Sequence, residues 1–399
     1  MDRKFFASLY KERKLPAGQG YLRYFDLIFL LAVTLLGLLT RYVFRNVETM
    51  DYTICLGPWV EGFRQNGRAF FLDDSFNYTM PYMTFLYLIS KLPFRDLYLI
   101  KAFSTFFDLV LAVLCGKIVF HITGNRTRSL LCFGTVFCLP TVAVNSGLWG
   151  QCDCIYTTFL VASLYCILKD QSHRSMILYG IAFAIKLQSL FIFPFYVYLW
   201  VRKKVSIGQF FYIPLMYLAG CLPGLLAGRD LKRLLLTYVG QGNTEPWMLT
   251  WYWPNVYMLF GQTNFWKIYG KTGVLFCAAI LMLLLYGLVK KRVALSGENH
   301  LQILLLFSWG VLLFLPYMHE RYAYPADLLA IMLAFTLPKK WPIPVAAVFL
   351  SAVAYSGYLH GGCAFSQQPL CIIMIGLFGY GIRQVFFAKN PEMTSREEL

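Results

Sequence analysis

Charged side chains are scarce in this chain. Asp, Glu, Lys and Arg make up 14% of its 399 residues, whereas 58% of the residues are hydrophobic and 18% are aromatic. A soluble globular protein carries about a quarter charged residues, so the composition excludes that class. Apolar runs of roughly 17–25 residues, the length that crosses a bilayer as a helix, recur from end to end. The sequence therefore predicts an all-α, polytopic membrane protein.

The chain also lacks features of a separate soluble domain or a cleaved leader. No Ser/Pro-rich linker separates the apolar runs, and the basic residues 1–24 have neither the apolar core nor the small-residue cleavage site of a signal peptide. We expect a cytoplasmic basic segment at 1–24, one transmembrane domain at 25–387 and a cytoplasmic tail at 388–399.

Acidic residues are outnumbered, with 20 Asp and Glu against 36 Lys and Arg, which gives a formal charge of +16. The basic residues fall in short clusters between apolar runs and do not form one continuous face. This distribution is typical of membrane topology and not of a nucleic-acid interface. We expect the lipid bilayer as a partner and no nucleic acid.

The eleven cysteines do not predict a disulfide or zinc framework. Most of them lie inside apolar runs, where cysteine behaves as a small buried hydrophobic residue. Cys152 and Cys154 flank Asp153 too closely for the spacing of a zinc ribbon. We expect no cofactor, and the sequence leaves a divalent metal open.

Twelve segments are expected to cross the membrane. They are 25–44, 99–121, 129–147, 154–169, 175–190, 191–201, 207–227, 270–289, 301–317, 323–338, 341–358 and 369–387. The segment 78–93 is too short, so we expect an interfacial or re-entrant piece there. Without a crossing at 78–93, the Lys- and Arg-rich connections share the side of the N-terminus, as the positive-inside rule requires. Both termini are then cytoplasmic.

Two long connections, 45–98 and 228–269, are external in this topology. Each contains a stretch that we expect to form an amphipathic helix in the membrane interface, "ICLGPWVEGFRQNG" (54–67) and "TWYWPNVYMLFG" (250–261). The polar residues that topology does not explain lie on this same external face.

Two acidic residues on the external side have two readings each. Asp51 follows the first span and is either the N-cap of the next helix or a catalytic base, and the two roles are compatible. Asp153, in "WGQCD", is also a candidate N-cap. Beside it, Trp149 and Gln151 suit a sugar, because an aromatic face stands next to an amide that both donates and accepts. Trp149 is alternatively an aromatic of the interfacial belt.

Two cations on the external side are not topology signals. Lys186 lies within an expected apolar helix, where it either meets an anionic ligand or extends to the headgroups. Arg321 suggests an anionic ligand by the same logic, with a lipid phosphate as the obvious candidate. His319 and Glu320 either position Arg321 or form a local salt-bridged cluster with it.

One further charged residue has a structural reading. Asp108 follows Lys101 by seven residues on one expected helix, and we expect it to form a structural ion pair.

Six motifs occur in a recognisable order. They are "MDYTICLGPWVEGFRQNG", "NYTMPYMTFLYLIS", "WGQCDCIY", "AIKLQSLFIFPF", "WPNVY" and "MHERYAYP". Together they resemble GT-C membrane glycosyltransferases, and most of all bacterial predicted mannosyltransferases related to the second mannosyltransferase of GPI-anchor synthesis. The likeness runs from the first span to about residue 338, and the last two spans add little. The sequence at 78–82 is "YTMPY", whereas relatives have "YTPPY". We expect this difference to have no effect on catalysis.

The resemblance implies a GT-C fold and a polyprenyl-phosphate sugar donor, used on the outer face of a bacterial plasma membrane. It also implies an Asp of the first external loop as general base, which here falls on Asp51. We expect the donor phosphate near Arg321 and Lys186, with His319 and Tyr322. Sugar or acceptor contacts are expected from Asp153, Gln151, Trp149, Glu320, Gln188, Asn77 and Tyr78.

The implied reaction is chemically reasonable. A leaving phosphate needs positive charge and no proton donor, whereas the acceptor hydroxyl needs a carboxylate. With one carboxylate in line, the transfer inverts the configuration at the anomeric carbon. The sugar is a hexose, mannose by the family's name, and the acceptor is a glycan, a lipid or a protein. Asp153 could share the base role with Asp51. The competing class is a transporter or flippase of lipid-linked sugars, although we see no internal repeat, and a third class is a non-catalytic assembly subunit.

Overall fold

The chain folds almost entirely into helices. The computed structural model describes residues 9–11, 13–14, 21–241, 248–260, 266–363 and 365–387. The strands in these ranges are two residues long: β1 (Arg13–Lys14) pairs antiparallel with β2 (Tyr21–Leu22), and β3 (Thr250–Trp251) pairs parallel with β4 (Met318–His319). The all-α class predicted from the sequence is confirmed.

The helical elements follow one another with short connections. In the first half they are α2 (Tyr24–Val43), η1 (Tyr52–Leu56), α3 (Gly57–Asn66), η2 (Gly67–Leu72), α4 (Met80–Ile89), α5 (Asp96–Thr123), α6 (Arg126–Cys138), α7 (Pro140–Ala143), η3 (Val144–Trp149), α8 (Asp153–Leu168), α9 (Ser172–Ile185), η4 (Leu187–Ile192) and α10 (Phe193–Val201). In the second half they are η5 (Ile207–Phe211), α11 (Tyr212–Leu226), α12 (Leu231–Leu235), α13 (Thr237–Gln241), η6 (Val256–Phe260), α14 (Trp266–Lys291), α15 (Gly297–Phe314), α16 (Tyr324–Thr336), η7 (Pro338–Lys340), α17 (Pro342–Leu359) and α18 (Gln367–Phe387).

Several helices have the dimensions of membrane spans. Among the described residues, six are long and apolar enough to cross a bilayer, and the pair Arg126–Cys138 and Pro140–Trp149, bent by 45°, would be a seventh. Other apolar helices, such as α8 and α16, are shorter. A multi-pass membrane protein is therefore supported, while the twelve crossings expected from the sequence stay a prediction.

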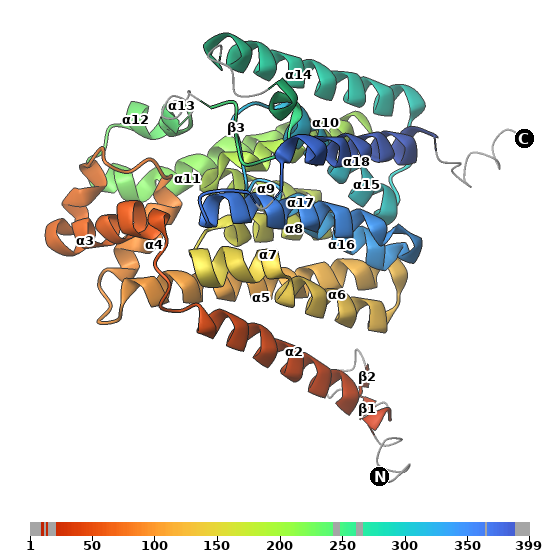
Figure 1. The fold of residues 1–399 in the computed structure, drawn as a ribbon, viewed down its shortest axis with the longest axis horizontal. Coiled ribbons are helices and arrows are strands. Elements are labelled where there is room, and N and C mark those ends of the chain that lie inside the picture. Colours follow the sequence, from red (N-terminus) through yellow and green to blue (C-terminus); the bar gives the residue numbers. More distant parts are fainter. Residues whose placement is uncertain are drawn as a thin grey trace, which may run out of the picture.

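Two of the shorter apolar helices, α8 and α16, lie inside the bundle. Nearly every residue of α16 is buried, whereas only 17% of the residues in the most apolar stretch of α2 are buried. A helix that is apolar all round must be buried in protein or face lipid. Figure 1 accordingly shows α2 at one edge of the bundle and α14 at the other, with α8 and α16 between them. The core thus sits around α15 and α16, and α2 presents its apolar side chains to the surroundings.

The two long connections meet at one end of the bundle. In Figure 1, α3, α4, α12 and α13 gather at the left end, while the start of α2 and the end of α18 lie at the right end. This arrangement agrees with the expectation that 45–98 and 228–269 share one side. Which side faces the cytoplasm stays a prediction.

The first connection folds largely as expected. Residues 54–67 form the end of η1 followed by α3, but Trp59, Val60 and Phe63 are buried against other protein segments. α4 has ten residues and is therefore about 15 Å long, about half the thickness of the hydrocarbon core. This agrees with the prediction that 78–93 does not cross.

Two expected helices differ in the structure. The stretch 250–261 was expected to be an amphipathic helix, yet Thr250 and Trp251 are strand residues and only the 3₁₀ turn η6 follows. Pro254 removes a backbone donor at this point, and β3 finds its partners in β4 instead. Residue 261 lies outside the described residues. The expected helix 175–190 ends at Ile185, because Lys186 is extended with φ −151° and ψ 134°.

Candidate active site

Asp51 lies just before the π-turn η1 and is held by three side chains from distant segments. Its carboxylate accepts hydrogen bonds from Trp149 Nε1 at 2.8 Å, from Tyr358 Oη at 2.6 Å and from Gln151 Nε2. Its backbone is helical, and its side chain makes no capping bond. The N-cap reading is therefore wrong, because the carboxylate points toward the bundle and not along its own helix.

Asp51 and Arg321 line the same cavity. The cavity has a volume of about 280 Å³, and His319 of β4 also lines it. Its other polar and aromatic lining residues are Trp59, Asn77, Tyr78, Gln151, Trp251 and Tyr358. The residues that line the cavity come from six separate segments of the chain, so the cavity exists only through the packing of the external connections on the bundle. Asp51 and Arg321, which lie in different segments of the sequence, thus share one cavity.

The guanidinium of Arg321 donates a hydrogen bond to one carboxylate, and its Nη2 has no acceptor among the described residues. Its Nη1 donates to Glu320 Oε1 at 2.6 Å, its Nε lies 3.8 Å from Asp153 Oδ2, and its Cζ lies 5.2 Å from the centre of the Trp149 ring. Within the described ranges, no side chain or carbonyl accepts from its Nη2. That end of the guanidinium is therefore available to a ligand in the cavity.

Glu320 is fully buried and ionised. Burial raises the pKa of its carboxyl, but the neighbouring Arg321 and then His319 lower it by more, so the net pKa lies below the ordinary value of 4.5. Its Oε2 has no hydrogen-bond partner within the described residues. Glu320 thus neutralises Arg321 from behind and does not line the cavity. Of the two readings left open, a local salt-bridged cluster is present, and it also orients Arg321.

Lys186 and Asp153 form a second buried pair behind the cavity. Lys186 Nζ donates to Asp153 Oδ1, and Asn145 Nδ2 donates to Asp153 Oδ2 at 3.1 Å. The Lys186 side chain is 10% exposed and Asp153 is fully buried, so the lysine does not extend to the headgroups. The N-cap reading of Asp153 is also wrong, because Cys152 is the cap and Asp153 is the first helical residue.

The three carboxylates differ in their contacts with cations. Asp153 is paired with Lys186, and Glu320 is paired with Arg321. Asp51 is bound by three neutral donors, and within the described residues no cation lies at ion-pair distance from it. Of the three carboxylates, Asp51 is therefore the one outside an ion pair, and it is the one that lines the cavity.

The remaining predicted residues divide between the cavity and the protein interior. Gln151, Asn77 and Tyr78 line the cavity. Trp149 is fully buried, and its ring stacks on Tyr358 with centroids 4.6 Å apart. The structure thus uses Trp149 to hold Asp51, and it is not a belt aromatic.

Two predicted residues stand apart from the cavity. Tyr322 packs against His319, with ring centroids 5.0 Å apart, and Phe191 packs on its other side. Gln188 has a buried Oε1 without a partner within the described residues. Neither residue lines the cavity.

Sequence reasoning missed three lining aromatics, Trp59, Trp251 and Tyr358. Tyr358 is the most informative because it lies in α17, a span that adds little to the family likeness, and yet it donates to Asp51. Its position near the end of an apolar helix resembles that of any interfacial aromatic. No pattern in the sequence separates it from the others.

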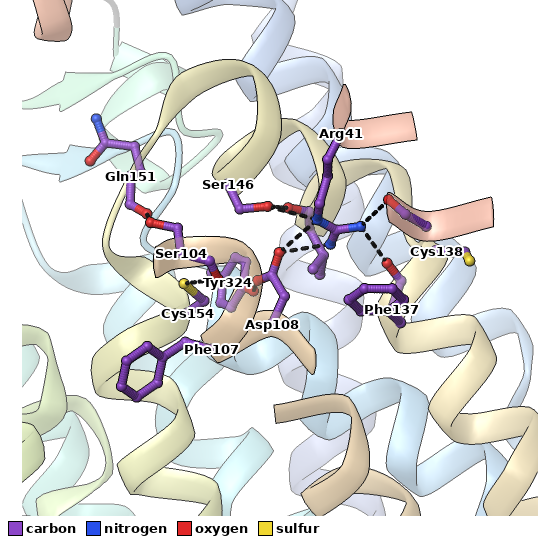
Figure 2. Close-up of polar contacts among 12 residues, drawn as sticks. Arg41, Ser104, Phe107, Asp108, Phe137, Cys138, Ser146, Gln151, Cys154 and Tyr324 are labelled. Atoms are coloured by element: carbon purple, nitrogen blue, oxygen red, sulfur yellow. Dashed lines mark hydrogen bonds and ion pairs between the residues drawn. The ribbon is translucent and has the colours of Figure 1, made fainter. Parts of the chain in front are cut away.

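A second polar cluster lies deeper between α2 and α5. Arg41 donates to Asp108 Oδ2 from Nη2 at 2.7 Å, and Tyr324 Oη donates to Asp108 Oδ1 at 3.0 Å (Figure 2). Arg41 also meets Ser146 and the carbonyl of Phe137. Asp108 is thus in a structural ion pair as predicted.

The partner of Asp108 differs from the one that helix spacing suggests. Lys101, which lies seven residues before Asp108 on α5, donates to the carbonyls of Phe44 and Val47. Arg41 reaches Asp108 from α2 because α2 and α5 both pack against η3.

The described residues contain no group of three or more His, Cys, Asp or Glu side chains that could hold a metal ion. No family model matches this chain. A search of curated proteins also gave no match. The family likeness therefore rests on the six motifs, and function is argued from the site.

Proposed function

We propose that the protein is an inverting glycosyltransferase that moves a hexose from a polyprenyl-phosphate donor to an acceptor hydroxyl. The observation that carries the proposal is that Asp51 and Arg321 line one cavity of about 280 Å³. A carboxylate that is in no ion pair can take a proton, and a guanidinium with a free end can hold a phosphate. The two groups needed for this transfer thus line one cavity.

The reaction uses Asp51 as general base. The acceptor hydroxyl gives its proton to Asp51 while its oxygen forms a bond to the anomeric carbon. The bond from that carbon to the phosphate oxygen breaks, and the phosphate leaves with the electron pair. Trp149, Gln151 and Tyr358 keep the carboxylate fixed, and Oδ1 with its single protein donor keeps a lone pair for the acceptor.

The donor phosphate is assigned to Arg321 and His319. Both line the cavity, and Arg321 Nη2 has no protein acceptor within the described residues. Trp251 stacks on His319 with ring centroids 5.7 Å apart and rings parallel within 1°, which fixes the imidazole. Lys186 is a weaker candidate than the sequence suggested, because Asp153 already neutralises it outside the cavity.

The lipid part of the donor has apolar space close by. A second cavity of about 350 Å³ is walled by aromatics, among them Tyr82, Phe85 and Phe103. The Tyr82 ring contacts Tyr78 with centroids 5.1 Å apart, and Tyr78 lines the site cavity. A polyprenyl chain can therefore lie beside the sugar site without crossing charged residues.

Asp153 is assigned a positioning role. It is fully buried, paired with Lys186 and absent from the cavity lining, so an acceptor hydroxyl cannot reach it without displacing protein. Its distance of 3.8 Å from Arg321 Nε places it behind the guanidinium. This arrangement favours Asp51 over Asp153 as the base.

The test is a transfer assay with purified protein in liposomes that contain a polyprenyl-phosphate sugar. Asp51→Asn keeps the size of the side chain and removes its basicity, so we expect turnover to fall by at least about 100-fold. Glu61→Gln on α3 is the matched control, because Glu61 is 52% exposed and lies away from the cavity, and its turnover should stay unchanged. Near-normal turnover of Asp51→Asn would refute the base assignment.

The same liposomes separate the competing classes. A transporter or flippase would move the labelled donor across the bilayer without transferring its sugar, and an assembly subunit would do neither. Translocation without transfer in the wild-type protein would therefore overturn the enzyme proposal.

A further inference from the structure

An apolar groove lies away from the candidate active site, between α2 and α5. Its volume is about 830 Å³, and its walls are apolar, with Leu38, Leu39, Phe106 and Leu109 among them. The side chains of Leu38, Leu39 and Phe106 are 44%, 52% and 57% exposed. In a membrane-embedded bundle this groove opens toward lipid, and it has the volume of a small-ligand site.

One end of the groove holds a buried lysine with no acid in contact. Lys101 is 5% exposed, and its ammonium donates to the carbonyls of Phe44 at 2.7 Å and Val47 at 2.6 Å. No carboxylate within the described residues lies at ion-pair distance from it. A lysine without a counter-ion is costly in an apolar setting, so an anion supplied from outside would stabilise it.

A second cation, Arg45, lines the same groove. The Arg45 guanidinium lies over the Tyr42 ring, 3.9 Å from its centroid, and Nη1 donates to the Tyr42 carbonyl at 3.0 Å. Its remaining donors have no partner within the described residues. Arg41 also lines the groove, but Asp108 compensates its charge. Lys101 and Arg45 are therefore the uncompensated pair.

We propose that this groove binds an anionic phospholipid of the bilayer. Its phosphate lies between Lys101 and Arg45, and an acyl chain follows the wall formed by Leu38 and Phe106. Basic pockets at the ends of apolar helices have the charge and shape that such headgroups require. The site does not depend on the proposed glycosyl transfer.

The lipid would brace the segment that holds Asp51. Gly147 lines the groove, and it belongs to the same π-turn, η3, as Trp149. Trp149 donates to Asp51, and its carbonyl accepts from Thr49 Oγ1 at 3.3 Å. A lipid in the groove therefore restrains η3, and through Trp149 it restrains the segment that contains Thr49 and Asp51.

The experiment measures lipid binding without any sugar substrate. Protein in detergent is titrated with phosphatidylglycerol, phosphatidylcholine and polyprenyl phosphate, and bound lipid is counted by native mass spectrometry. We expect phosphatidylglycerol to bind at least about 10-fold more tightly than phosphatidylcholine, and the difference to shrink with added salt.

Two variants localise the site. Arg45→Gln removes one cation and should weaken phosphatidylglycerol binding by about 10-fold, the loss of roughly one charge contact. Ala102→Trp fills the groove and should weaken binding by at least as much, because the acyl chain is excluded. Arg383→Gln on the exposed surface of α18 is the control, and it should bind as the wild-type protein does. Thermal unfolding verifies that every variant is folded.

Three outcomes would overturn the proposal. They are equal binding of the two phospholipids, unchanged binding in both groove variants, and displacement of phosphatidylglycerol by polyprenyl phosphate, which would assign the groove to the donor. None of these results bears on whether Asp51→Asn abolishes transfer, so the two proposals fail separately.

Discussion

At the scale of single residues, Arg321 is the group whose charge has the most consequences. One side of its guanidinium is tied to Glu320, and the Trp149 ring lies 5.2 Å from its Cζ. Only Nη2 is left for a ligand within the described residues. Because a single amino group of Arg321 is left for a ligand, a substitution at this residue should affect the binding of the donor more than the binding of the acceptor.

Charge reversal tests that assignment. Arg321→Glu places a carboxylate where the proposal has a donor phosphate, so we expect the KM for the donor to rise by at least about 10-fold while the KM for the acceptor changes less. Steady-state kinetics with each substrate varied in turn measure both values. An equal loss for the two substrates would count against a phosphate site at Arg321.

Glu320 predicts a dependence of stability on acid. Its pKa is lower in the folded protein than the ordinary value of 4.5, so the folded state favours the ionised form. The stabilisation is therefore complete above pH 4.5 and is lost as the pH falls through the lower, folded pKa. We expect the wild-type protein to unfold at a higher temperature than Glu320→Gln near pH 7.

The measurement is thermal unfolding of both proteins between pH 7 and pH 3. The gap between their unfolding temperatures should narrow in the acid range. A gap that is the same at all pH values would show that the Glu320–Arg321 contact contributes nothing through ionisation.

At the scale of elements, a buried ion pair joins α2 to the rest of the bundle. Arg41 and Asp108 are 4% and 0% exposed, and Tyr324 of α16 and Ser146 of η3 complete their hydrogen bonds. Breaking a buried pair leaves an uncompensated charge, whereas removing both charges is often tolerated. The cluster is thus a matched set that joins four elements.

This predicts strong coupling between the two positions. Arg41→Met should lower the free energy of unfolding by about 3–5 kcal/mol, and Arg41→Met combined with Asp108→Leu should recover much of that loss. Denaturant unfolding in detergent micelles gives the double-mutant cycle. Additive losses would contradict the coupling that we expect from the contacts drawn in Figure 2.

The break between α9 and η4 is an element-level feature with a chemical cause. Lys186 leaves the helix with φ −151°, and this conformation turns its ammonium toward Asp153 of α8. The apolar pattern on both sides predicts one continuous helix. A local pattern cannot show the break, because the partner that stabilises it lies 33 residues away in the chain.

At the scale of the whole molecule, the topology can be tested directly. The charge distribution predicts cytoplasmic termini and external connections at 45–98 and 228–269. A reporter fused after residue 387 should be active only if it is cytoplasmic, and an epitope inserted at Asp73, in an exposed turn, should be labelled from outside intact cells. Labelling of that epitope only after permeabilisation would invert the orientation.

Composition and apolar periodicity predicted the all-α membrane class, and the twelve expected segments each contain a described helix. The same patterns located Asp51, Gln151, His319 and Arg321, because polar residues at span ends are conspicuous in an apolar chain. They did not predict which carboxylate is left without a cation, since that depends on contacts between elements.

The sequence by itself therefore determined the membrane environment of the fold and the residue types available for chemistry, because hydrophobicity and charge are local properties. Only the tertiary structure decided which of them meet. It buried Asp153 against Lys186, paired Asp108 with Arg41 and not with Lys101, and brought Tyr358 from α17 to Asp51. Buried charges require partners, and close packing selects those partners from segments that the chain order keeps far apart.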